Sequence, residues 1–349
     1  MSNAVIDQAE KVLAHTYKRF PLLLLRGEGC TLFDHQNKAY TDLVAGIAVC
    51  NLGHAHGRVA AAIERQAKQL VHVSNLYYTQ PQVELAQWLV NNCFADRVFF
   101  CNSGAEANEA AIKLTRKYFK DNGHPQRFRI ISAQGSFHGR TMATLSATGQ
   151  EKIRKGFDPV LEGFDFVPFN DVPALQAAIG PETAAVLLEP IQGEGGVNMP
   201  AADYLSKVRR LCDEAGLLLI FDEIQTGMGR TGKLFAHQHF NVVPDIMTLA
   251  KALANGLPIG AMLATEKVAQ AFVPGSHAST FGGTPLVTAA ALEVTKVMDE
   301  MEGPARAAEI GAHLKTRLSE LADRFKVVKE VRGLGLMIGI ELHAAAAPI

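Results

Sequence analysis

At 349 residues the chain exceeds one average domain of about 100–200 residues, so one large domain or two unequal domains are expected. Hydrophobic residues make up 48% and charged residues 20% of the chain, which is ordinary for a globular protein with a sizeable core. A formal net charge of -1 gives no electrostatic case for binding nucleic acid or an anionic membrane surface, so small-molecule chemistry is the favoured function class.

No targeting signal is predicted at the N-terminus, because Asp7 and Glu10 stand where a signal peptide needs an apolar core. The longest apolar runs are far shorter than the ~18 residues of a membrane span. We therefore expect a soluble, cytoplasmic protein. The cysteines are odd in number and lack any C-x-x-C spacing, which predicts mostly buried, free thiols at Cys30, Cys50, Cys93, Cys101 and Cys212.

Short strands and then two helices are predicted before the main sheet. Residues 18–42 alternate short apolar runs with glycine, Asp-His and Asn-Lys turn signals, which favours short antiparallel strands in an accessory layer. Residues 58–70 and 81–93 each place apolar side chains at helical spacing. Two amphipathic helices are therefore expected in these segments.

The middle of the chain alternates apolar runs with helical patterns, which predicts an α/β fold with a parallel sheet. The strand candidates are residues 98–101, 129–133, 184–188, 217–221 and 246–249. In such sheets ligands bind beyond the carboxyl ends of the strands. The five runs are followed by NSGAEANE, QGSFHGRT, EPIQGEGG, DEIQTG and AKALANG, so polar residues and glycine gather at one predicted edge.

The pattern changes after Thr280, and a long helical segment is predicted through Met301. A second helix is predicted from an apolar face made of Ile310, Leu314, Leu318, Leu321 and Phe325. The sequence VVKEVRGLGLMIGIEL, residues 327–342, then has the composition of strands. We expect this part of the chain to form a second, smaller domain.

A helix start is predicted in NSGAEANE. Ser103 and Glu106 have the S-x-x-E spacing of a capping box, which on its own indicates only a well-formed helix start. The free backbone N–H groups of Gly104 and Ala105, at the positive end of the helix, could equally hold a phosphate. A phosphorylated cofactor or substrate would fit there.

The second and third strand ends offer further candidates. Phe137, His138 and Arg140 are, taken singly, more typical of core packing, a loop hydrogen bond and a solvated charge. Beside a cofactor, Phe137 could stack on a ring and Arg140 could bind a carboxylate bidentately. Glu189 and Glu194 lie within a glycine-rich turn and could pair with a cationic group or accept a proton.

An acid and an amine end the last two predicted strands. Asp222 directly follows the apolar run LLLIF, so its carboxylate is expected to be partly buried and to need a partner, such as a protonated ring nitrogen. Most lysines are surface residues, but the apolar neighbours of Lys251 in TLAKALANGLP would lower the pKa of its amine and favour covalent chemistry with an aldehyde. Together with a phosphate site, these groups are what a pyridoxal phosphate enzyme supplies.

Two other motifs are weaker. The segment GMGRTGK, residues 227–233, nearly fits a P-loop, but Leu234 stands where the P-loop needs a hydroxyl group, so nucleotide hydrolysis is not favoured. His54 and His56 in GHAHG lack a third ligand at a recognisable spacing, so no metal site is predicted.

The motifs together resemble those of the class III aminotransferases, a family of fold type I pyridoxal phosphate enzymes. The matching text is NSGAEANEAAIK, FHGRT, EPIQGEGGV, IFDEIQTGMGRTGK, TLAKALANGLPIGA, STFGGTPL and VRGLGLMIG, in family order. Within the family, FHGRT and RGEG are most similar to the acetylornithine branch. The resemblance implies a mostly parallel sheet flanked by helices in a large domain, residues 57–285, and a smaller α+β domain built from residues 1–56 and 286–349.

The resemblance implies roles around pyridoxal 5'-phosphate. Lys251 would carry the aldehyde covalently and transfer a proton, and Asp222 would pair with the pyridinium nitrogen. Further contacts are implied for Gln225 at the ring hydroxyl, Phe137 on the ring face, Gly104 and Ala105 at the phosphate, and Thr280 at the phosphate site of the other subunit in a homodimer.

Substrate contacts are implied for residues around the cofactor. Arg140 would bind the substrate α-carboxylate, and Ser279 would lie near the substrate. Arg332 in VRGLG resembles a second carboxylate-binding arginine, which Glu194 would cover when the amino donor is bound.

The implied reaction moves the terminal amine of N2-acetylornithine, or of a close acyl-ornithine, to 2-oxoglutarate and yields a semialdehyde and glutamate in arginine biosynthesis. Ornithine, succinylornithine and N-succinyl-diaminopimelate share this amine and stay open as donors. An amino-aldehyde mutase and an inactive homologue also stay open. The family continues for some dozens of residues beyond Leu342, so the C-terminal domain is expected to be truncated.

Overall fold

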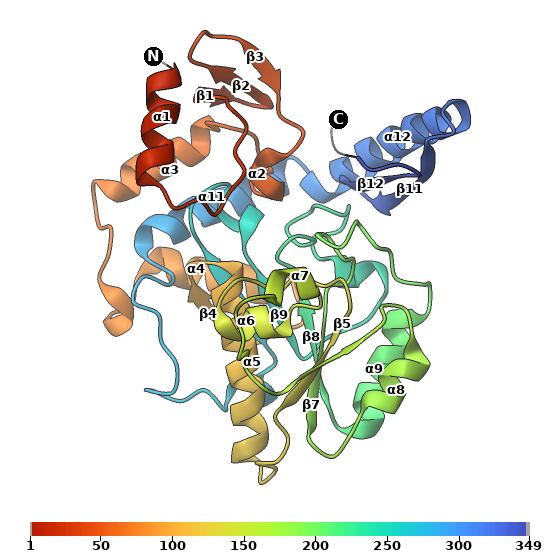
Figure 1. Ribbon diagram of the computed structural model, residues 1–349. Coiled ribbons are helices and arrows are strands. Elements are labelled where there is room, and N and C mark those ends of the chain that lie inside the picture. Colours follow the sequence, from red (N-terminus) through yellow and green to blue (C-terminus); the bar gives the residue numbers. More distant parts are fainter. Residues whose placement is uncertain (1, 347–349) are drawn as a thin grey trace.

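A seven-stranded sheet forms the centre of the protein in a computed structural model that describes residues 2–346 (Figure 1). The strand order is β4-β10-β9-β8-β7-β5-β6. The bounds are β4 Arg97–Cys101, β5 Arg129–Ala133, β6 Phe164–Val167, β7 Thr183–Leu188, β8 Leu218–Asp222, β9 Ile246–Leu249 and β10 Gly260–Ala264. All five predicted strands are present, each within one residue of its expected position, and the predicted α/β fold is confirmed.

The strand directions bring the motifs to one edge of the sheet. Strands β5 to β9 pair in parallel, and β10 runs antiparallel to both of its neighbours, β9 and β4. Since β4 and β9 are both antiparallel to β10, β4 points in the same direction as the parallel strands. The carboxyl ends of β4, β5, β7, β8 and β9 therefore lie at the same edge.

Two strands of the sheet are missing from the sequence-based prediction. Strand β6, FDFV, is short and carries an acid, and β10, GAMLA, consists largely of glycine and alanine. The shortness of β6 and the glycine and alanine content of β10 each weaken the local strand pattern. Pairing with β4 and β9 on both sides forms β10, and that pairing is a tertiary effect.

Helices and short 3-10 helices (η) surround the sheets. Their bounds are α1 Ser2–Val12, α2 Ala45–Ala48, α3 Gly57–Ala67, η1 Ser74–Leu76, α4 Gln80–Asn91, α5 Gly104–Asp121, α6 Met142–Ala147, α7 Glu151–Arg154, α8 Val172–Ala178, α9 Tyr204–Ala215, η2 Ala236–His239, η3 Lys251–Ala254, α10 Glu266–Ala269, α11 Pro285–Glu300 and α12 Gly303–Arg324. The predicted amphipathic helices correspond to α3 and α4, which confirms them.

Alternate residues of the central strands pack on opposite layers. In β8, Leu219 and Phe221 join the cluster formed with α8 and α9, whereas Leu218 and Ile220 join the cluster formed with α5 (Figure 1). Asp222 is the next residue on the α5 face, so the strand period directs its carboxylate toward that helix.

The N-terminal segment forms the predicted accessory layer of antiparallel strands. Strands β1 Leu24–Glu28, β2 Thr31–Asp34 and β3 Ala39–Thr41 make a separate three-stranded sheet near the N-terminus (Figure 1). The five cysteines are free, and the expected burial is confirmed for Cys101 and Cys212. Cys50 and Cys93 are only partly buried, and the expectation is wrong for Cys30, which is exposed in the turn between β1 and β2.

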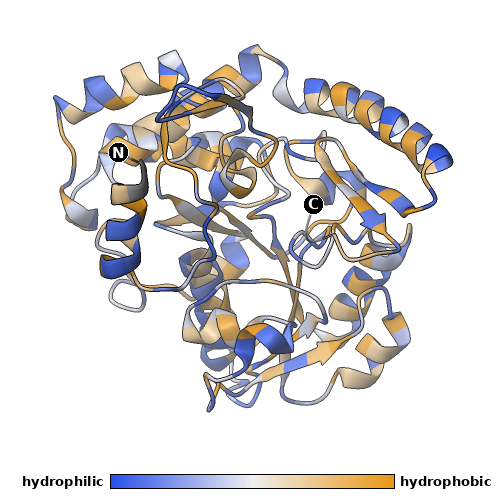
Figure 2. Cartoon of the chain, turned by 45° about the horizontal axis from the view of Figure 1, so that its top comes forward, coloured by the Kyte–Doolittle hydropathy of each residue, from blue (hydrophilic) through white to orange (hydrophobic). Residues whose placement is uncertain are grey.

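The C-terminal segment forms a helix on a two-stranded sheet. The predicted helix and strands are present as α12 and as the hairpin of β11 Val328–Leu334 and β12 Met337–Leu342, and α12 packs on this hairpin, a contact that the sequence did not indicate. Figure 2 shows apolar residues recurring along α12, and Ile310 and Leu314 are partly exposed there. The division into domains stays a prediction, and α11, which follows the expected boundary at residue 285, packs on α3 and α4 of the preceding segment.

Among residues 2–346, no helix combines the length and the apolar character needed to cross a membrane.

Candidate active site

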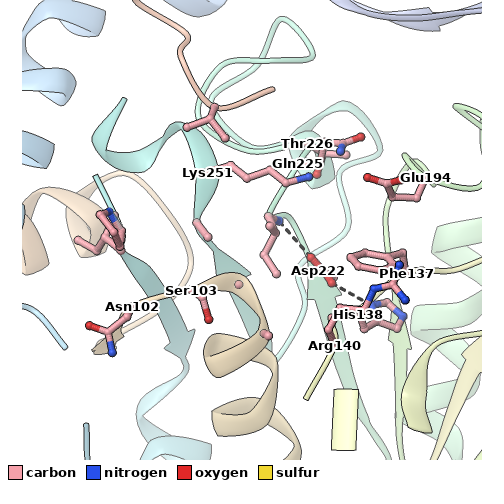
Figure 3. Close-up of a pocket in the computed structure, with 18 of the residues that line it drawn as sticks. Asn102, Ser103, Phe137, His138, Arg140, Glu194, Asp222, Gln225, Thr226 and Lys251 are labelled. Atoms are coloured by element: carbon pink, nitrogen blue, oxygen red, sulfur yellow. Dashed lines mark hydrogen bonds and ion pairs between the residues drawn. The ribbon is translucent and has the colours of Figure 1, made fainter. Parts of the chain in front are cut away.

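A cavity of about 430 Å³ opens at the carboxyl edge of the sheet, a size ordinary for a small-molecule site. Figure 3 shows side chains from several strand ends pointing into it. Eight predicted site residues line it, namely Gly104, Ala105, Phe137, Arg140, Glu194, Asp222, Gln225 and Lys251. The motifs that follow five strands therefore form one site.

Lys251 is the first residue of η3, and its amine points into the cavity (Figure 3). Its φ of 42° lies in the left-handed region, where backbone strain is typical of functional sites. Burial lowers the pKa of the amine, against the raising effects of Glu194, Asp222 and Glu189. A lowered pKa leaves more neutral, nucleophilic amine at neutral pH, which suits covalent chemistry with an aldehyde.

Asp222 ends β8 and is buried, as predicted. Its Oδ2 atom lies 2.7 Å from Asn108 Nδ2 and 2.8 Å from His138 Nδ1, and its Oδ1 atom accepts a hydrogen bond of 3.1 Å from the Ile224 N–H. These donors hold the carboxylate in place at the cavity wall. A carboxylate at this position fits the protonated ring nitrogen of pyridoxal phosphate.

The start of α5 forms another wall of the cavity. Ser103 Oγ accepts a hydrogen bond of 3.2 Å from Glu106 N, which is one half of the predicted capping box. The other half is absent, because the Glu106 carboxylate accepts from the Asn102 N–H instead (2.8 Å). A Cβ atom on Gly104 would lie 2.7 Å from Ile224 Cδ1, so glycine lets the helix start approach β8. The first N–H groups of the helix have no intrahelical partners and suit a phosphate.

Aromatic and charged side chains close the site on the β5 and β7 side. Phe137 is half-buried, and the Cζ atom of exposed Arg140 lies 5.5 Å from the centre of its ring. Glu194 is exposed at the cavity, and Gln225 lies beside Lys251 (Figure 3). A flat ring face, an available guanidinium and an acid thus surround the space above Asp222.

Glu189 also lines the cavity, although the resemblance assigns it no role. Its carboxylate accepts hydrogen bonds from the N–H groups of Phe137 (3.1 Å) and Gly193 (3.0 Å). Burial raises the pKa of this carboxyl group to about 7. Glu189 therefore connects the two loops that carry Phe137 and Glu194.

Asn108 and Thr248 are functional candidates that the sequence reasoning missed. Asn108 lies in α5, four residues after Gly104 and three before Ala111, so helical spacing places it on the buried face. A polar side chain on a buried helix face needs a hydrogen-bond partner, so the position of Asn108 could have marked it as a candidate from the sequence. Nothing in the sequence around Asn108 indicates that this partner is Asp222, more than a hundred residues later.

Ser279 and Thr280 lie outside the main cavity and line an adjacent hollow of about 350 Å³. Ser279 Oγ accepts a hydrogen bond of 3.2 Å from Asn102 Nδ2, and Asn102 lines both spaces. Thr280 is exposed. Its expected role at the phosphate of another subunit stays a prediction.

Arg332 is likewise not brought into the cavity. Its guanidinium donates to the carbonyl oxygens of Gly196 (2.7 Å) and Val197 (3.0 Å), and it pairs with the carboxylates of Glu330 (2.8 Å) and Glu341. These contacts bind β11 to the end of the EPIQGEGG loop. The expected contact between Arg332 and a substrate carboxylate would require this side chain to leave its present partners.

The weaker motifs lie elsewhere in the fold. None of residues 227–233 lines the cavity, and the Arg230 guanidinium contacts Asn51. His54 Nε2 lies 2.6 Å from Asp42 Oδ2. Within residues 2–346 there is no group of three His, Cys, Asp or Glu side chains placed to hold a metal ion.

The sequence and the fold match known aminotransferases. The model of the aminotransferase class-III family matches residues 12–348. The acetylornithine aminotransferase of Myxococcus xanthus is 50% identical over 100% of this chain and 87% of the relative, and that of Thermosynechococcus vestitus is 54% identical over 97% and 83%.

Solved structures of aminotransferases are also similar to this chain. The ornithine aminotransferase of Toxoplasma gondii superposes with a TM-score of 0.94 at 35% identity, over 98% of this chain and 82% of that one. The acetylornithine aminotransferase of Elizabethkingia anophelis gives a TM-score of 0.87 at 34% identity, over 98% and 85%. This chain therefore belongs to the class-III aminotransferase family.

Proposed function

We propose that this protein transfers the terminal amine of N2-acetylornithine, or of a close acyl-ornithine, to 2-oxoglutarate, with formation of the semialdehyde and glutamate in arginine biosynthesis. One observation carries the proposal. Lys251 and Asp222 meet at a single cavity, in a chain about half identical, over nearly its whole length, to acetylornithine aminotransferases.

Pyridoxal 5'-phosphate is the cofactor of this family, and when bound it supplies an aldehyde and an electron-withdrawing ring. Lys251 Nζ would hold the aldehyde covalently, and the same amine would accept and return the proton of the reacting carbon. Asp222 would pair with the ring nitrogen and keep it protonated. The remaining cofactor contacts are assigned to Gln225 at the ring hydroxyl, Phe137 on the ring face, and Gly104, Ala105 and a neighbouring subunit's Thr280 at the phosphate.

Arg140 is the proposed ligand of the substrate α-carboxylate. It is exposed at the cavity, and among residues 2–346 no carboxylate lies within ion-pair distance of its guanidinium, which leaves its donors available for bidentate binding. Ser279 and Glu194 complete the proposed substrate side. A contact between Arg332 and the second carboxylate of 2-oxoglutarate belongs to the same proposal.

We also infer a cytoplasmic homodimer with the active site at the subunit interface. Asn75 Nδ2 donates to the carbonyl oxygens of Ser279 (3.2 Å) and Gly282 (2.9 Å), so Asn75 joins its segment to the loop that carries Thr280. The next three residues, Leu76, Tyr77 and Tyr78, are all exposed, and Tyr78 is 99% exposed. A contiguous exposed apolar segment of this kind is typical of a contact with another chain. Light scattering should give a dimer mass, and Tyr78→Glu should lower it.

An absorbance spectrum of the purified protein tests the central proposal. Wild-type protein reconstituted with pyridoxal 5'-phosphate should show the band of the covalently bound cofactor, and acetylornithine should convert it to the band of the aminated cofactor. Adding 2-oxoglutarate should restore the first band. Conversion by ornithine or succinylornithine at a higher kcat/KM than by acetylornithine would reassign the donor, and a protein that binds no cofactor would refute the proposed activity.

A further inference from the structure

A chain of buried hydrogen bonds lies behind Asp222, on the side away from the cavity. Thr248 Oγ1 donates to Asn108 Oδ1 (2.8 Å), and Asn108 Nδ2 donates to Asp222 Oδ2 (2.7 Å) and to the carbonyl oxygen of His138 (2.8 Å). The side chains of Asn108 and Thr248 are fully buried, and neither lines the cavity. Their polar atoms are therefore committed to one another and to Asp222.

The amide of Asn108 has one favourable orientation in this network. Its nitrogen faces two acceptors, the Asp222 carboxylate and the His138 carbonyl, and its oxygen faces the Thr248 hydroxyl. A flipped amide would place its oxygen against two other oxygens in a fully buried site, which is costly. The Thr248 hydroxyl fixes the oxygen end and so helps keep the donors turned toward Asp222.

The fold explains why Thr248 occupies this position. In the parallel pair of β8 and β9, Thr248 is the register neighbour of Asp222, and Asn108 approaches both from α5. A β-branched threonine in a strand has restricted χ1 rotation, so its hydroxyl is held in place. Three elements distant in sequence thus meet at one carboxylate.

His138 completes the environment of the Asp222 Oδ2 atom. Its Nδ1 atom lies 2.8 Å from this oxygen, and its buried Nε2 atom has no hydrogen-bond partner among residues 2–346. Oδ2 is therefore contacted by the side chains of Asn108 and His138, whereas Oδ1 carries one backbone N–H bond.

We propose that Asn108 and Thr248 are positioning residues that hold the Asp222 carboxylate in its orientation toward the cofactor ring. This proposal rests on the proposed pairing of Asp222 with the ring nitrogen. Neither residue reaches the cavity, so both act through Asp222.

Thr248→Val tests the network, because it removes the hydroxyl and keeps the shape of the side chain. The dissociation constant of pyridoxal 5'-phosphate should rise about ten-fold, as expected when a hydrogen bond to a charged group is weakened. The band of the bound cofactor should weaken in parallel at sub-saturating cofactor. Thr248→Ser, which restores the hydroxyl, should recover most of the affinity.

Thr115→Val is the matched control. Thr115 is another fully buried threonine, and its hydroxyl donates within α5 to the Ala111 carbonyl oxygen (2.8 Å), away from Asp222. Both valine variants should lower the melting temperature of the apoprotein to a similar extent, and Thr115→Val should leave cofactor affinity within two-fold of wild type. Equal losses of affinity in both variants would reduce Thr248 to a general packing role and overturn the proposal.

A double variant separates this proposal from the proposed function. In an Asp222→Asn background, Thr248→Val should cause little further loss of cofactor affinity, because the carboxylate that it positions is gone. Independent, additive losses would contradict the proposed route through Asp222. If Asp222→Asn itself leaves cofactor affinity unchanged, the proposed role of Asp222 is wrong. If Asp222→Asn lowers cofactor affinity but Thr248→Val does not, only the positioning role of Thr248 is refuted.

Discussion

The wall of the cavity at Asp222 and the rim at Arg140 differ in how their charges are satisfied. Asp222 is buried and receives hydrogen bonds from α5, the β5 loop and its own strand end. Arg140 and Glu194 line the same cavity and are exposed. The hydrogen-bond partners of Asp222 come from this chain, whereas the charges of Arg140 and Glu194 face solvent.

This difference separates two tasks. The Asp222 carboxylate is already ordered by its hydrogen bonds, so it loses little conformational entropy when a cofactor that stays bound contacts it. Exposed charges can bind and release different substrates in turn, at the cost of ordering each time. We therefore expect substitutions near Asp222 to affect the cofactor and substitutions at the rim to affect substrate affinity.

The largest effect is expected for Lys251→Ala. Removing the amine that binds the aldehyde and moves the proton should lower kcat by at least ~10³-fold and abolish the band of the covalently bound cofactor. Steady-state kinetics and an absorbance spectrum measure both effects. Lys267→Ala, at an exposed lysine of α10, should behave as wild type, and retained turnover in Lys251→Ala would remove the catalytic assignment.

Arg140→Gln should act at the rim. Loss of the guanidinium should raise KM for the amino donor about 10–100-fold, because charge-assisted hydrogen bonds to a carboxylate are lost, while cofactor affinity stays unchanged. Arg210→Gln, at an exposed arginine of α9, provides the matched control. A change in cofactor affinity without a change in KM would place Arg140 with the cofactor residues instead.

Glu189 should make stability depend on pH. Its pKa of about 7 in the folded protein lies above the value of 4.5 for the free group, so the folded state holds a proton that the unfolded state releases. The free energy of unfolding should therefore fall as pH rises from about 4.5 to 7, by about 3 kcal/mol in total.

Urea unfolding of the apoprotein at pH 5 and pH 8 measures this fall. Glu189→Gln should remove most of it, because glutamine does not titrate. Glu194→Gln, at an exposed position of the same loop, should leave it in place. An unchanged pH dependence in Glu189→Gln would show that another group is responsible.

The smallest effect is expected for Arg332→Gln. This variant tests whether Arg332 mainly tethers β11 to the loop at Gly196 and Val197 or mainly binds a substrate. Loss of its contacts to Gly196 and Val197 should destabilise the protein by about 1–2 kcal/mol and raise KM for 2-oxoglutarate only a few-fold. A more than ten-fold rise in KM at unchanged melting temperature would show that substrate binding outweighs the tethering role, and an unchanged KM would contradict the proposed contact of Arg332 with 2-oxoglutarate.

The strand ends were predictable because buried parallel strands carry continuous apolar runs. The runs before Asp222 and Lys251 fix where each strand stops, and the topology of a parallel sheet then brings those ends together. Strand β10 was not predictable, because its Gly-Ala sequence is formed into a strand by its neighbours. The prediction that Cys30 is buried was also wrong, because Cys30 lies in a turn and a turn can expose an apolar segment.

The sequence by itself determined the α/β fold, the family, and the residues at the ends of the strands, because these follow from local apolar runs and motifs. Only the tertiary structure decided the partners of each charge. Asp222 meets Asn108 and Thr248, and Arg332 is occupied by Glu330 and Glu341, outside the cavity. Hydrogen bonds and ion pairs act over a few ångströms in space, and local sequence patterns do not encode which distant side chains come that close.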